Sequence, residues 1–192
     1  YPLYTIDQIQ RVLPDSLAVG NDRSPRTGDT VRVRGCVMSR AIVSSTLRKP
    51  IMWAGARWMT YIRDKNAAIN DFNGLNVVLD DTTATTAITQ FDMIDTATVY
   101  EFTGVVTEFN RQTQLNLLKT VPVVSLGSSG SRGAPVEAAL SSFATGTVPN
   151  GAAGEKYEDV YVVLRNVITS DRNTSTSAAN PFSIQDANGN KI

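Results

Sequence analysis

The chain has 192 residues, of which 42% are hydrophobic and 19% charged, a composition typical of a globular protein with a substantial buried core. No stretch approaches the roughly 18 consecutive apolar residues of a membrane-spanning helix. There is no histidine and one cysteine, which excludes Ser-His-Asp and Cys-His catalysis, removes the commonest metal ligand and rules out an intrachain disulfide.

The formal net charge is zero, but the charge is unevenly distributed along the chain. Residues 1–66 contain eleven Lys and Arg against five Asp and Glu, whereas residues 67–192 contain seven against thirteen. Such an asymmetry can direct association between unlike surfaces of two molecules. The alternative is that folding mixes the two sets of charges on one surface.

The first predicted element is a short helix near the N-terminus. Thr5 and Gln8 have the spacing of a capping box, and Ile6 and Ile9 begin an apolar pattern with helical spacing. We expect Pro14 to end this helix, because proline cannot donate the next backbone hydrogen bond.

Five strands follow, marked by alternating apolar and polar residues and by turn residues between them. Gly35 and Gly104 lie inside two of them and indicate a bulge or a tight bend. A Thr- and Ala-rich stretch between the third and fourth strands predicts a short helix or an irregular connection. The predicted strands cover residues 31–37, 57–64, 75–79, 97–109 and 112–124.

This order of strands is the pattern of a five-stranded OB barrel. A three-layer α/β fold is disfavoured, because no amphipathic helices of adequate length separate the strands. Residues 1–125 are therefore predicted to form an OB-like barrel with a short N-terminal helix. Residues 126–156 are rich in Gly, Ser, Ala and Pro and predict a linker, and residues 157–192 begin a second β unit.

The second unit repeats the first. Residues 31–39 match residues 162–170, and residues 60–64 match residues 182–186. The second copy thus contains two strands, which rarely form a stable unit alone. We expect it to be completed by further chain beyond Ile192, by other parts of the protein or by a neighbouring subunit. The predicted fold class is all-β with one or two short helices: an OB-like barrel followed by a second, incomplete OB-like β unit.

Several segments resemble the OB-like domains of secreted bacterial multidomain proteins. They are Gly28–Val37, Tyr61–Asp64, Gly74–Val77, Glu108–Leu115 and Glu155–Val162, followed by Asn166 and Val167. Similar modules lie beside the catalytic domain of extracellular nucleases and occur in surface proteins of the Bacteroidetes type. The resemblance covers about residues 3–192 and implies a fold and secretion, while the nuclease catalytic domain is not in this chain.

No catalytic, cofactor or metal site is predicted. Cys36 lies in a strand with no motif that would activate a thiolate, so it is interpreted as a structural thiol. The aspartates at positions 80, 81, 92 and 95 do not have the spacing of an EF-hand loop. The segment 186–190 resembles a calcium loop but lacks the remaining ligands, and a hairpin turn at Asn188-Gly189 explains it better.

The strongest candidate for a ligand or partner surface is a basic face on the first two strands. Its residues are Arg32, Arg34, Arg57, Tyr61 and Arg63. OB folds bind single-stranded nucleic acid or sugars around strands 2 and 3, where aromatic rings stack on bases and cations follow phosphates. Trp58 is predicted to point the other way, into the core. The competing interpretation is a solvated basic surface with no ligand.

The expected function is that of a non-catalytic structural or assembly module at the cell surface, polymerising head to tail into a filament. Its expected partners are other copies or other surface proteins, with no membrane span. The chain begins at Tyr1, so an extracellular location after removal of a signal peptide is expected, and Asn173 begins a glycosylation sequon. The alternative is a single-stranded nucleic-acid-binding accessory module of a secreted nuclease.

Overall fold

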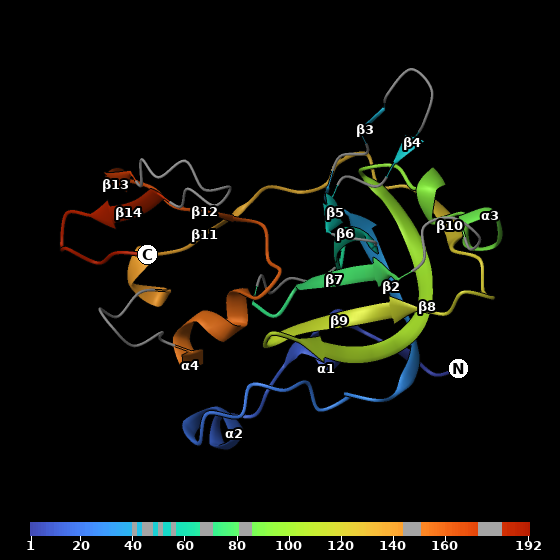
Figure 1. Ribbon diagram of the computed structural model, residues 1–192, viewed down its shortest axis with the longest axis horizontal. Coiled ribbons are helices and arrows are strands. Elements are labelled where there is room, and N and C mark those ends of the chain that lie inside the picture. The colour runs from blue at the N-terminus through green and yellow to red at the C-terminus, as the bar shows by residue number, and fades with distance from the viewer. Residues whose placement is uncertain are drawn as a thin grey trace.

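The regular secondary structure of the described residues is mainly β-strand, with a few short helices (Figure 1). The computed structural model describes residues 1–39, 42–43, 48–49, 52–54, 57–65, 71–80, 86–143, 151–172 and 182–192. The sequon at Asn173 lies outside these residues. None of the helices in the described part of the chain is long and apolar enough to cross a membrane.

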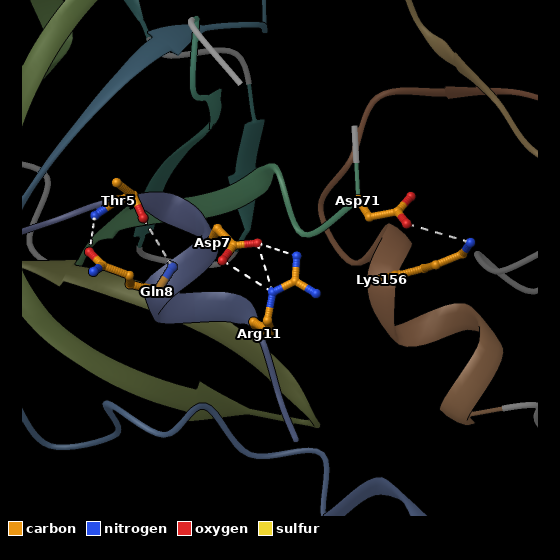
Figure 2. Close-up of polar contacts among 6 residues, drawn as sticks. All are labelled: Thr5, Asp7, Gln8, Arg11, Asp71 and Lys156. Carbon is orange, nitrogen blue, oxygen red and sulfur yellow. Dashed lines mark hydrogen bonds and ion pairs between the residues drawn. The ribbon is translucent and has the colours of Figure 1, made fainter. Parts of the chain in front are cut away.

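Helix α1 (Ile6–Gln10) begins at the predicted capping box. Thr5 Oγ1 accepts the Gln8 backbone N–H, and the Gln8 side chain accepts the Thr5 N–H (Figure 2). The prediction that Pro14 ends this helix was wrong: α1 ends at Gln10, and Pro14 begins helix α2 (Pro14–Ala18). The fixed φ of proline suits the first helical position, where its missing N–H costs nothing.

All five predicted strands are present. The first four are β2 (Thr30–Val37), β6 (Arg57–Arg63), β7 (Gly74–Leu79) and β8 (Thr98–Phe109). The fifth, β9 (Gln112–Leu117), is shorter than predicted, because the chain turns after Leu117 and starts a further strand, β10 (Val124–Ser128). The connection between β7 and β8 contains α3 (Thr86–Thr89) and the 3-10 turn η1 (Phe91–Met93).

These five strands pair in a closed cycle, which we call the strand ring. The order is β2-β6-β7-β9-β8 and back to β2, with β7 and β9 parallel and all other neighbours antiparallel. Short strands extend the sheet: β1 (Leu3–Tyr4) beside β2, β5 (Met52–Ala54) beside β6, and β10 beside β8. A separate pair joins β3 (Ile42–Val43) to β4 (Arg48–Lys49).

The core lies inside the strand ring, and α1 packs against it. Ile6 and Ile9 are fully buried together with alternate residues of every ring strand, and Phe91 meets Phe102 edge to face at 6.4 Å between ring centroids. Trp58 belongs to this core, as predicted. Strand β7 is buried on both faces, so its outer face is covered as well.

Strand β2, which contains Gly35, pairs with a different strand on each of its two edges. Residues 30–36 of β2 pair with β8, whereas Cys36 and Val37 pair with β6. A Cβ at position 35 would lie 2.7 Å from Ile62 Cδ1, closer than real side chains approach. Glycine at this position therefore leaves room for Ile62 of the neighbouring strand β6.

The C-terminal part of the chain runs from β10 along the strand ring and away from it (Figure 1). Strand β10 pairs with β8 up to Ser128, past the predicted boundary at residue 125. The following elements are β11 (Val136–Glu137), η2 (Leu140–Ser142), α4 (Gly151–Gly154), η3 (Glu155–Tyr157) and β12 (Val162–Val163), with β11 parallel to β12.

The last two strands, β13 (Val167–Arg172) and β14 (Phe182–Asp186), form an antiparallel hairpin. The predicted turn at Asn188-Gly189 is confirmed: Gly189 has a φ of 82°, and Ile184 exchanges two backbone hydrogen bonds with Ile192. The Asp186 carboxylate accepts the backbone N–H groups of Asn188 and Asn190, a local turn arrangement.

Shortening a buried side chain of α1 tests whether this helix packs in the core. Ile9→Ala should lower the free energy of unfolding by about 2–5 kcal/mol, because it empties a fully buried site. Leu13→Ala is the matched control, since Leu13 is 67% exposed and should change stability by less than about 0.5 kcal/mol. Urea denaturation followed by circular dichroism measures both, and equal effects would contradict the placement of α1.

Candidate functional site

Arg32 and Arg34, the first two residues of the predicted basic face, share one carboxylate. Their side chains lie outside the strand ring, and both reach Glu101 on β8, at 3.1 Å from Arg32 Nη1 and 2.8 Å from Arg34 Nε. Burial alone would raise the pKa of Glu101, but the hydrogen bond from Arg34 and the charges of both arginines lower it. Much of the positive charge at this end of the face is thus compensated.

Arg57 is also paired. Its Nε lies 2.8 Å from Asp80 Oδ1, and its guanidinium carbon lies 5.0 Å from the centre of the Phe109 ring. Both contacts join the basic N-terminal part of the sequence to its acidic remainder, as the contacts to Glu101 do. Folding therefore mixes the two sets of charges at these positions.

Tyr61 and Arg63 lie further along the outer face of β6 and turn toward the segment after β10. Arg63 Nη1 donates to the Ala134 carbonyl at 3.2 Å, and its guanidinium packs directly on Gly133. Tyr61 is half-buried. Burial and the nearby Asp159 raise the pKa of Tyr61, opposed by a hydrogen bond with Gln112. The five predicted residues thus belong to three separate groups of contacts.

A cavity of about 470 Å³ lies where Tyr61 faces the C-terminal segment. Its walls come from the end of β2, from β6, from the segment after β10 and from the residues before β12. The lining residues are Met38, Ser39, Tyr61, Arg132, Asp159, Val160 and Tyr161. A smaller adjoining hollow shares Met38, Val160 and Tyr161 with it and adds Arg63.

The C-terminal segment is fastened to the ring by the backbone of Asp159. Asp159 has a φ of 56°, and its carbonyl lies so close to Gly74 that a Cβ there would come within 2.0 Å of the oxygen. The Phe72 N–H donates to the Lys156 carbonyl at 2.7 Å, and Lys156 Nζ lies 3.7 Å from Asp71 (Figure 2). Gly74 is therefore required for this close approach.

Four carboxyl groups line this attachment, and we call them the acidic seam: Glu108, Glu155, Glu158 and Asp159. Glu158 accepts the Thr113 N–H at 2.8 Å. Asp159 accepts the Asn76 N–H at 2.8 Å and the Gln112 side-chain amide at 2.6 Å. Glu108 accepts the Ser24 N–H at 2.9 Å. The seam thus supplies acceptors to backbone donors of three different segments.

Burial and neighbouring negative charges raise the pKa values of Glu155, Glu158 and Asp159. Burial is the largest cause in each case; hydrogen bonds oppose it for Glu158 and Asp159, and the neighbouring negative charges add to it. The pKa reaches about 7 for Glu155, about 8 for Glu158 and about 7 for Asp159. The nearby cations pair elsewhere, Lys156 with Asp71 and Arg111 with Asp22.

Other chemistry is sparse in the described part of the chain. It holds no group of three or more His, Cys, Asp or Glu placed to bind a metal ion. Cys36 is a buried free thiol, with its Sγ 3.3 Å from Ser129 Oγ. Its burial agrees with the structural role predicted for it.

Sequence reasoning missed Arg132, Asp159 and Tyr161. Arg132 lies in the predicted linker, and the other two lie at the start of the predicted second unit, so no pattern marked them as part of a common surface. The one available signal was the density of acidic residues between Glu155 and Asp159, which is unusual for a segment that lies against other chain.

Comparisons with known proteins identify no family. No family model matches the chain, and no curated protein matches it. Among solved structures, an aspartyl-tRNA synthetase of Leishmania major is similar over 82% of this chain and 27% of that one, at 13% identity and a TM-score of 0.40. The chain thus spans about a quarter of that protein's length, and so low a score carries no argument about fold or activity.

The acidic seam makes stability depend on pH. A carboxyl whose pKa is raised by folding stabilises the folded state fully only below its unfolded-state pKa, and that contribution is lost as pH rises through the folded-state pKa. The urea midpoint should therefore fall from about pH 4.5, the ordinary pKa of these carboxyl groups, to about pH 8, the highest folded-state value.

Glu158→Gln isolates this effect, because the amide keeps an oxygen for the Thr113 N–H but cannot ionise. The variant should match the unmodified protein at the lower pH and exceed its stability at the higher pH. Glu137→Gln is the control, since that side chain is 67% exposed and paired with Arg165. A midpoint that is the same at both pH values in the unmodified protein would refute the raised pKa values.

Proposed function

We propose that this chain is a non-catalytic structural and assembly module of a secreted or cell-surface protein, and that copies associate by strand addition between unlike edges. The observation that carries the proposal is the hairpin of β13 and β14. Among the described residues these strands pair only with each other and with the short segment at Lys191–Ile192.

The topology supports the finer proposal that the strand ring is an OB-type barrel. Five strands close on one another, and the helical connection falls between the third and fourth of them, as in that fold. The hairpin repeats the β2–β6 pairing: Val37 pairs with Ile62, and their repeat equivalents Ile168 and Ile184 pair across the hairpin with an offset of one residue. This similarity supports a second, incomplete unit of the same type.

The hairpin leaves its apolar side chains uncovered. No residue of β13 or β14 with a described side chain is buried, and Ile168 is 67% exposed. An isolated two-stranded hairpin is marginal in water, so another strand or face must cover it to stabilise it. The outer edge of β14 already bonds to Ile192, so β13 carries the edge of the hairpin that no other described strand pairs with.

A second open edge lies at the other end of the molecule. All residues of β10 are exposed, and among the described residues β10 pairs on one side only, with β8. It contains neither the charge nor the proline that commonly blocks an edge strand. Strands β10 and β13 lie at opposite ends of the long axis (Figure 1), so a β10–β13 contact between copies would continue head to tail.

Placing a lysine on either edge tests the proposal. The unmodified protein should form concentration-dependent oligomers, measured by size-exclusion chromatography with light scattering and seen as rows of particles by electron microscopy. Leu126→Lys in β10 and Ile168→Lys in β13 should each yield monomers, because a charged edge opposes strand pairing.

Leu13→Lys is the matched control, because Leu13 and Ile168 are both 67% exposed. It should associate as the unmodified protein does, and circular dichroism should show that all three variants remain folded. A protein that stays monomeric up to about 100 μM, a concentration that would reveal even weak specific association, would overturn the proposal.

A further inference from the structure

The cavity between the strand ring and the C-terminal segment has the dimensions and the chemistry of a small-ligand site. Its volume of about 470 Å³ falls within the roughly 300–1,000 Å³ of such sites. The lining residues include Met38 and Val160, which are apolar, and two tyrosines, an arginine and an aspartate, which are polar. Because the walls belong to separate segments, the cavity exists only while the C-terminal segment is attached.

Two arginines, Arg132 at this cavity and Arg63 at the smaller adjoining hollow, have no carboxylate partner among the described residues. Within the described part of the chain, the Arg132 guanidinium contacts Tyr161, with its central carbon 4.9 Å from the ring centre and Nη2 3.3 Å from the hydroxyl. Arg63 donates to a backbone carbonyl and lies against Gly133, the residue after Arg132. By contrast, Arg32, Arg34 and Arg57 are all paired with carboxylates. Of these five arginines, Arg63 and Arg132 are therefore the two whose positive charge is available to a ligand.

Aromatic surface accompanies this charge. Tyr61 and Tyr161 line the cavity from two different segments, and Tyr161 is 37% exposed. The hydrogen bond and ring contact with Arg132 give that guanidinium a defined position. A planar ring can stack on tyrosine, while guanidinium groups bind phosphate through paired N–H donors.

We propose that this cavity binds a nucleotide, with the base against the tyrosine rings and the phosphate at Arg63 and Arg132. Binding here is independent of the strand edges proposed for assembly, because neither β10 nor β13 lines the cavity.

Isothermal titration calorimetry on the unmodified chain tests this with adenosine and uridine monophosphates, adenosine, inorganic phosphate and a single strand of about ten nucleotides. The monophosphates should bind at least tenfold more tightly than adenosine or phosphate, since both parts of the site are then used. If the single strand binds more tightly than the monophosphates, the natural ligand is a nucleotide within a polymer. If the two bind with equal affinity, the natural ligand is a free nucleotide.

Arg132→Ala and Tyr161→Ala should each weaken monophosphate binding by about tenfold or more, with the fold retained because both side chains lie at the surface. Arg23→Ala and Tyr1→Ala are the matched controls, being exposed residues of the same types that do not line the cavity. Inorganic phosphate binding as tightly as the monophosphates, or no heat from any probe at about 10 mM, would overturn the proposal.

Discussion

The two-sided pairing of β2 is the constraint on which the rest of the structure depends. Strand β2 pairs with β8 through residues 30–36 and with β6 at Cys36 and Val37, and Gly35 leaves room for Ile62 of β6 because it has no Cβ. Without this pairing of β2 to both neighbours, the five strands would form an open sheet with two edges. With it, the apolar faces of all five strands converge on one core, to which α1 contributes Ile6 and Ile9.

Closure of the ring also determines what can happen outside it. Strand β7 is buried on both faces, so its outer face must be covered by other chain. The absence of a side chain at Gly74 lets the Asp159 backbone reach that face, and the Lys156–Asp71 pair lies beside the contact. The cavity at Tyr61 is a consequence of this attachment, because three of its lining residues, from Asp159 to Tyr161, arrive with the attached segment.

Local patterns in the sequence predicted the strands and the first helix cap, because these depend on neighbouring residues. Alternation placed β2, β6, β7 and β8 within one residue of their bounds, and the Thr5 capping box is present. The candidate site was not predicted from such patterns, because it depends on contacts between residues that are distant in the sequence. The pairing of Arg34 with Glu101 follows from the β2–β8 register, in which these residues lie directly opposite, and no local pattern specifies that register. Likewise, nothing in the composition of residues 126–156 indicated that Gly133 would lie against Arg63.

The acidic seam places carboxyl groups close together, which is energetically unfavourable, and the hydrogen bonds that these groups accept explain why the arrangement is stable. A loop that attaches to the outside of a sheet covers backbone N–H groups, which then need acceptors other than water. Carboxylates are the strongest acceptors available. Glu158, Asp159 and Glu108 satisfy the N–H groups of Thr113, Asn76 and Ser24. The same geometry brings the carboxyl groups close to one another, and the repulsion is relieved when protons bind. The hydrogen bonds to these backbone N–H groups thus come with repulsion between the carboxylates. Protonation reduces this repulsion and strengthens the attachment that also forms the cavity.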